Sequence, residues 1–162
     1  MRGVWGLLLV VLVAGCSAGD DPAIDPGKRK AAADAAAAEG RWVEAASLYG
    51  EAFALEDPVP SRAKARAFLA LRRAWALKRA DQAADALAWL RWAERLDPTL
   101  YPLHLERAMI HDGHIPHLAA PETALVEYER YLEGWRAAGE PAAEAEMASH
   151  ARGRVDELTS AD

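Results

Sequence analysis

Four of the five histidines of the chain lie close together, in the stretch LHLERAMIHDGHIPH that covers residues 103–117. Imidazole and carboxylate groups are ligands that zinc accepts, so this stretch is a candidate metal site. The candidate ligands are His104, His111, His114 and His117. However, the stretch contains no HExxH pattern. The helix is expected to break at Gly113, and with Ile115-Pro116 inserted after it the spacing does not indicate that the four side chains converge. We therefore expect solvent-exposed loop histidines and no metal, with a metal- or pH-responsive envelope protein as the alternative.

A second candidate site is an aromatic face between residues 61 and 80. Phe68, Leu71 and Trp75 follow one another at intervals of three and four residues, which places them on one side of a helix. Basic side chains flank this face, and the segment contains no Asp or Glu; they are Lys64, Arg72, Lys78 and Arg79. Aromatic anchors supply much of the binding energy at protein interfaces, and charge supplies orientation. The pattern favours a groove for an acidic or C-terminal segment of a partner protein.

The same basic segment has a second interpretation, in which its charges serve the fold alone. Its lysines and arginines then pair with acidic neighbours, such as Glu51, Glu56 and Glu94. In that case Trp75 packs on the next hairpin and offers no surface to a partner. The sequence leaves both interpretations open.

No residue pattern in the chain predicts catalysis. The glycines that surround a nucleophilic serine are missing around Ser47, Ser61, Ser149 and Ser160. The chain has no glycine-rich phosphate loop and no paired-carboxylate motif. Its net charge of -6 argues against nucleic acid as a partner. We expect a binding protein that is not an enzyme and has no cofactor, nucleic acid or small-molecule substrate.

The only cysteine, Cys16, follows an apolar run that extends from Val4 to Ala14 behind the basic residue Arg2. Spanning a bilayer takes about 20 apolar residues, so the run is too short for a membrane helix. A basic residue followed by roughly 7–15 apolar residues is the layout of a secretory signal. The alternative, a buried core helix, requires burial on every side.

The four residues Val13-Ala14-Gly15-Cys16 resemble the bacterial lipobox, in which an aliphatic residue and two small residues precede a cysteine. The resemblance implies a diacylglyceryl group on the sulfur of Cys16, cleavage just before it, and acylation of the new amino terminus. Two or more acyl chains anchor a protein stably. Ser17 follows the cysteine. In the enterobacterial version of the family, an Asp at this position favours retention in the inner membrane. We therefore expect a lipid-anchored protein of the bacterial cell envelope, at the outer membrane and facing the periplasm.

The rest of the chain predicts an all-α fold. We divide the chain into a signal peptide over residues 1–15, a lipidated flexible tether over residues 16–27 and a helical domain over residues 28–162. In this domain proline and glycine separate segments that are rich in Ala, Leu, Glu and Arg. None of these segments shows the alternation of apolar and polar residues that is typical of a strand. The predicted helices cover residues 28–39, 41–56, 61–80, 82–97, 101–112, 121–137 and 141–158.

Two stretches of this domain follow one plan, GRWVEAASLYGEAFALEDP (40–58) and DQAADALAWLRWAERLDP (81–98). Each carries two alanines seven residues apart; they are Ala45 with Ala52 and Ala86 with Ala93. PETALVEYERYLEGW (121–135) is a third copy with Ala124 and Tyr128, in which Tyr131 replaces the second alanine. This pattern resembles the second helix of the tetratricopeptide repeat, where small residues let paired helices approach closely. The first helix of such a unit also carries small residues on its packing face. In the segment 61–80 these small residues are Ala63, Ala67, Ala70 and Ala74.

The resemblance implies a tetratricopeptide-like array of about three helical hairpins plus a C-terminal capping helix. It also places the aromatic face of residues 61–80 on the concave surface, where that family binds partner peptides. The spacing departs from the family, because Ala45, Ala86 and Ala124 are 41 and 38 residues apart, against a period of about 34. A plain helical bundle is the alternative fold. As a function we expect an adaptor or assembly lipoprotein that binds another envelope protein, or else a ligand-free structural subunit of an envelope complex.

Overall fold

Proline, glycine and one aspartate set the boundaries of the helices. The computed structural model describes residues 25–114 and 116–161, without the side chain of His114. Pro26 occupies the first turn of the first helix, and the Asp25 carboxylate caps it by accepting a hydrogen bond from the backbone N–H of Gly27 at 2.7 Å. That helix therefore begins two residues before the predicted start of the helical domain at residue 28. At its other end Gly40 adopts a φ of 74°, which suits glycine and stops the helix.

The described residues form seven α-helices and no strand, so the all-α prediction is confirmed. Each predicted segment coincides with one helix. The helices are α1 (Pro26–Ala38), α2 (Trp42–Leu55), α3 (Ala63–Arg79), α4 (Ala83–Leu96), α5 (Pro102–Met109), α6 (Pro121–Ala137) and α7 (Ala145–Ser160). Short 3-10 turns precede α3, α6 and α7. Within this part of the chain no helix has the length and apolar character needed to cross a membrane.

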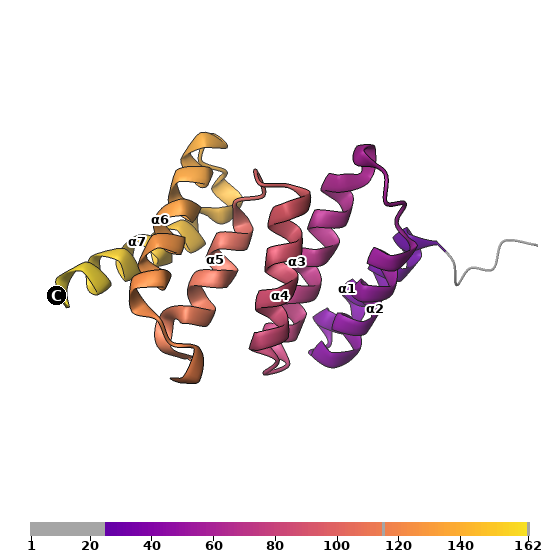
Figure 1. Cartoon of the computed structure of the whole chain (residues 1–162), viewed down its shortest axis with the longest axis horizontal. Helices are drawn as coiled ribbons and strands as arrows, with labels where there is room; N and C mark the ends of the chain where they lie inside the picture. Colours follow the sequence, from indigo (N-terminus) through magenta and orange to yellow (C-terminus); the bar gives the residue numbers. More distant parts are fainter. Residues whose placement is uncertain (1–24, 115, 162) are drawn as a thin grey trace, which may run out of the picture.

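Consecutive helices pack as antiparallel neighbours along the long axis of the molecule. Figure 1 shows them in chain order, from α1 and α2 at one end to α7 at the other. Within α1–α4 and within α5–α7 each helix packs closely on the next, whereas α4 and α5 share much less contact. Two buried clusters correspond to these two halves. The helical-hairpin packing is thus observed, and the tetratricopeptide register remains a prediction.

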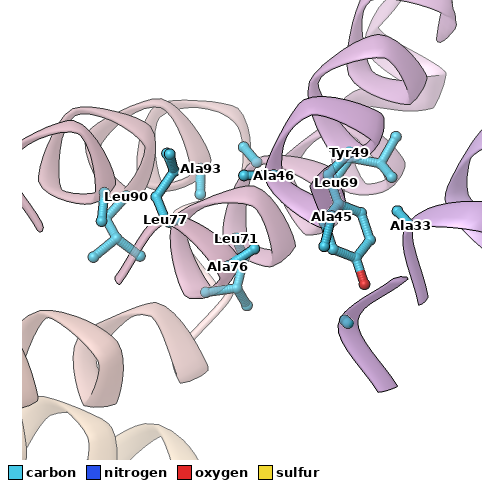
Figure 2. Close-up of a cluster of buried hydrophobic side chains, with 14 of the residues drawn as sticks. Ala33, Ala45, Ala46, Tyr49, Leu69, Leu71, Ala76, Leu77, Leu90 and Ala93 are labelled. Carbon is cyan, nitrogen blue, oxygen red and sulfur yellow. The ribbon is translucent and has the colours of Figure 1, made fainter. Parts of the chain in front are cut away.

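Alanine lets the helices of the first half approach closely. The alanines that the sequence repeat singled out, Ala45, Ala52, Ala86 and Ala93, are fully buried. Figure 2 shows this cluster, where Tyr49 is the one aromatic side chain among the labelled residues. Because a methyl group fills little space, burying so many of them requires short distances between helix axes. Shape matching between close helices therefore holds this half together, with few large side chains in its core.

The segment between α5 and α6 is a folded loop. After Met109 the helix widens into a turn over Ile110–His114, in which Gly113 has a φ of 88°. The Nδ1–H of His111 donates to the carbonyl oxygen of Leu118 at 2.9 Å, and the backbone N–H of Ala120 donates to the carbonyl of His111. The Tyr128 hydroxyl of α6 and the Arg154 guanidinium of α7 both donate to Asp112. These contacts tie the loop to the helices that follow it.

Candidate partner-binding groove

The aromatic face of α3 borders a groove of about 350 Å³. Phe68, Leu71, Arg72 and Trp75 lie on this wall, at the spacing of one helix face. The other walls come from three places in the second half of the molecule. They are the start of α5 (Leu100, Pro102, Leu105 and Glu106), Tyr131 of α6, and the start of α7 (Glu144 and Met147). The structure thus brings together four of the seven predicted site residues, and the groove spans both halves.

Apolar side chains at the edge of the groove are open to solvent. Phe68 of α3 and Met147 of α7 each expose 42% of their surface, while Leu71 and Leu105 are buried. Exposed large apolar side chains on a concave surface are typical of sites that bind a partner. A ligand that covered Phe68 and Met147 would gain roughly 25 cal/mol for each Å² of apolar surface removed from water.

Trp75 is held in place by the helix before it. Its ring meets the ring of Trp42 edge to face, with centroids 5.0 Å apart. The Arg72 guanidinium lies 4.7 Å from the centre of the Trp75 ring. This ring contact is with the preceding helix, whereas the second interpretation of the segment expects Trp75 to pack on the next hairpin. A fixed aromatic wall loses little side-chain entropy when a ligand binds.

Several of the predicted cationic side chains bind other side chains of the same fold. The Arg72 guanidinium donates to the hydroxyl of Tyr49 at 2.8 Å and to the carboxylate of Asp34 at 3.1 Å. Burial alone would raise the pKa of Asp34, but hydrogen bonds from Lys30, Tyr49 and Arg72 outweigh it and lower that pKa. These contacts keep the Asp34 carboxylate charged and pair it with both Arg72 and Lys30.

Three further cations lie beside the groove and do not line it. Lys78 forms an ion pair with Glu106 across the α3–α5 contact. The Arg79 guanidinium lies 5.7 Å from the centre of the Trp42 ring. Lys64 is exposed one helical turn before Phe68. Lys78 thus has a carboxylate partner, and the positive charges of Lys64 and Arg79 lie outside the lining of the groove.

Glu144 is the residue of the groove that sequence reasoning missed most clearly. The hydroxyl of Tyr101 donates to both oxygens of its carboxylate at 3.1 Å, and the hydroxyl of Tyr131 donates at 3.4 Å. Burial raises the pKa of both tyrosines, and the negative charge of Glu144 raises it further. A sequence signal did exist for the α5 wall, because Pro102, Leu105 and Glu106 repeat the spacing of Phe68, Leu71 and Arg72.

The predicted histidine cluster is spread over separate contacts. The Nδ1–H of His104 donates to the buried Glu127 carboxylate at 2.6 Å, and His111 bonds to Leu118 of its own loop. His117 is exposed on a short turn and borders a small hollow beside the start of α4. The side chain of His114 lies outside the described part of the chain. Within that part no group of three or more His, Cys, Asp or Glu side chains is arranged to hold a metal ion.

A second hollow, of about 550 Å³, lies between the start of α5 and the end of α6. Its walls include Tyr101, His104, Arg130 and Glu133, together with the last turn of α6 around Gly134. Arg130 already pairs with Glu127 at 3.4 Å, and His104 donates to the same carboxylate. The hollow is larger than the groove, but no large apolar side chain in its lining is exposed as Phe68 and Met147 are in the groove. We therefore favour the groove as the functional site.

The described fold defines an all-α protein of packed helical hairpins with one apolar groove across its two halves. Comparison with models of known families, with curated proteins and with solved structures finds no match for this chain. Cys16, the predicted lipid attachment site, lies outside the described residues.

Proposed function

We propose that this chain is a membrane-anchored adaptor of the bacterial envelope, which binds a segment of another envelope protein in the groove between α3, α5 and α7. The observation that carries the proposal is the exposure of Phe68 and Met147 on opposite walls of an otherwise ordered apolar groove. Apolar side chains that are exposed on the walls of a groove are typical of sites that a partner covers. Binding, rather than chemistry, is the activity that these residue types support.

The proposed anchor gives the groove its place in the cell. The lipobox-like Val13-Ala14-Gly15-Cys16 supports lipidation at Cys16, and the helical body begins at the Asp25 cap. A tether of this length keeps the groove close to the membrane surface. It also raises the effective concentration of the groove for partners in the same membrane, which strengthens weak binding without new contacts.

Truncating the two exposed groove residues tests the proposal. We expect Phe68→Ala together with Met147→Ala to reduce recovery of a cross-linked envelope partner by about tenfold or more, because each removes an apolar anchor worth about 1–2 kcal/mol. The measurement is quantitative cross-linking in intact cells, followed by purification of the chain and mass spectrometry. Both side chains are exposed, so the fold is expected to survive.

Val43→Ala is the matched control for this experiment. Val43 is 64% exposed on α2 and does not line the groove, so its truncation should leave recovery of the partner unchanged. Equal recovery for the double variant and the wild type would show that the groove is not the partner site. A loss with the control variant as well would point to a binding surface elsewhere on the molecule.

A further inference from the structure

The groove contains three charged side chains, and two of them have an oppositely charged side chain within ion-pair distance. Arg72 donates to Asp34 and Tyr49, and Glu106 forms an ion pair with Lys78. Glu144 differs from both. In the part of the chain that the structure describes, no Lys, Arg or His nitrogen lies within ion-pair distance of its carboxylate. One negative charge on the groove wall is therefore left without a counter-charge.

The carboxylate of Glu144 is held in position by neutral donors. Tyr101 and Tyr131 both donate to it, and the Tyr131 ring is fully buried. These hydrogen bonds satisfy some of its lone pairs, but phenol groups leave its charge in place. A fixed carboxylate beside apolar surface gains most from a cation that arrives with the ligand, because the surrounding apolar groups exclude water and weaken screening.

The geometry points to an apolar segment of a partner protein that carries a lysine or arginine, with the cation paired to Glu144 and apolar neighbours on Met147, Leu105 and Phe68. This inference depends on the proposed groove function and specifies its ligand. It also replaces the acidic ligand that the basic composition of α3 predicts. An acidic side chain would meet Glu144 as a like charge, and Arg72 would have to leave Asp34 to compensate it.

The test uses a phage-displayed library of random peptides, selected on the purified protein. We expect lysine and arginine to be enriched among the selected peptides, flanked by apolar residues. The most frequent peptide is then synthesised, and its affinity is measured for three proteins: wild type, Glu144→Gln and Glu146→Gln. The amide oxygen introduced by Glu144→Gln can still accept hydrogen bonds from the two tyrosines, so this change removes the charge and keeps the shape.

We expect Glu144→Gln to lower the affinity for the peptide by about tenfold or more, which is the usual contribution of a charge-assisted hydrogen bond. Glu146→Gln removes the same charge from an exposed position two residues away and should leave the affinity within about twofold. Circular dichroism of each variant confirms that the helices are intact.

Three results would overturn the inference. They are selected peptides rich in Asp and Glu or without charge preference, equal affinity for the wild type and Glu144→Gln, and selected peptides whose binding survives Phe68→Ala with Met147→Ala. None of them decides the adaptor proposal, which depends on cross-linking in cells. If cross-linking in cells recovers a partner through the groove and any of these three results is also found, the adaptor proposal is supported. The preference for a cationic ligand is then refuted.

Discussion

Glu127 shows how a single residue organises the second half of the molecule. Its side chain, in α6, is buried, and it accepts hydrogen bonds from Nδ1–H of His104 at 2.6 Å and from Arg107 at 3.1 Å. Arg107 also reaches Glu94 of α4 at 2.8 Å. Burial alone would raise the pKa of Glu127, but the hydrogen bond from His104 and the charge of Arg107 outweigh it and hold that pKa below its usual value. The network joins α4, α5 and α6 through one ionised carboxylate.

Removing this carboxylate should destabilise the fold. We expect Glu127→Ala to lower the free energy of unfolding by about 3 kcal/mol, because it leaves the partly buried Arg107 and His104 without their shared acceptor. Urea unfolding followed by circular dichroism gives the measurement. Glu129→Ala, an exposed glutamate two residues further along α6, is the control and should change little.

The same residue predicts a dependence on pH. Because the pKa of Glu127 is lower in the folded state than in the unfolded state, its contribution is fully present above the unfolded value of 4.5 and is lost as the pH falls through the folded value. The difference in unfolding free energy between the wild type and Glu127→Ala should therefore shrink under acid conditions. A difference that stays constant as the pH falls below 4.5 would contradict this.

At the scale of the elements, two glycines in neighbouring helices have opposite surroundings. A Cβ atom built on Gly134 of α6 would lie 2.2 Å from the Cβ atom of Tyr101, just before α5. A Cβ atom on Gly153 of α7 would have no neighbour within 4 Å. Gly134 therefore allows the start of α5 to lie against α6, which positions Tyr101 to donate to Glu144. Gly153 has no such role in the packing.

This contrast predicts opposite signs for the same substitution. Gly134→Ala should destabilise the protein by about 2 kcal/mol or more, because a Cβ–Cβ clash can be relieved only by moving a helix. Gly153→Ala should stabilise it by about 0.5–1 kcal/mol, since alanine favours the helical conformation. Thermal unfolding of the two variants beside the wild type provides the comparison. Similar shifts of the melting temperature would mean that α5 and α6 do not approach this closely.

At the scale of the whole molecule, the groove lies where two separately packed halves meet. The halves share little contact between α4 and α5, and the Lys78–Glu106 ion pair joins them across α3 and α5. Leu103 and Ile110 also enter the core of the first half. Charge reversal at Lys78 would therefore disturb this junction as well as the groove, and exposed groove residues are better probes of binding.

The proposed lipid anchor would be a property of the whole molecule as well, and one substitution tests it. We expect Cys16→Ala to move the chain from the membrane fraction to the soluble fraction and to abolish labelling by radioactive palmitate, because the acyl chains need the sulfur and the new amino terminus. Ser17→Ala leaves the sulfur in place and serves as the control. Retention of the Cys16→Ala protein on membranes would refute the anchor and the envelope location with it.

Much of the fold could be predicted from the sequence because its determinants are local. Helix boundaries follow from prolines and glycines, and the buried faces follow from the spacing of alanines such as Ala45 and Ala52. The aromatic face of α3 was also predictable, since Phe68, Leu71 and Trp75 share one side of a single helix. Trp92 shows the limit of such reasoning: it lies three residues after Trp89 on the same helix, yet Trp92 is 47% exposed while Trp89 packs on Phe53.

The sequence by itself determined the helices, their small-residue faces and the α3 wall of the groove, because periodicity within one helix decides which side chains share a face. Only the tertiary structure decided the charge of the site. Arg72 pairs with Asp34 across 38 residues, and Tyr101 holds Glu144 across 43. Neither pairing produces a periodic pattern in the sequence. Since the interaction between charges depends on distance in space, a helix rich in arginine and lysine forms one wall of a groove in which, among the described residues, the charged side chain without an ion-pair partner is a glutamate.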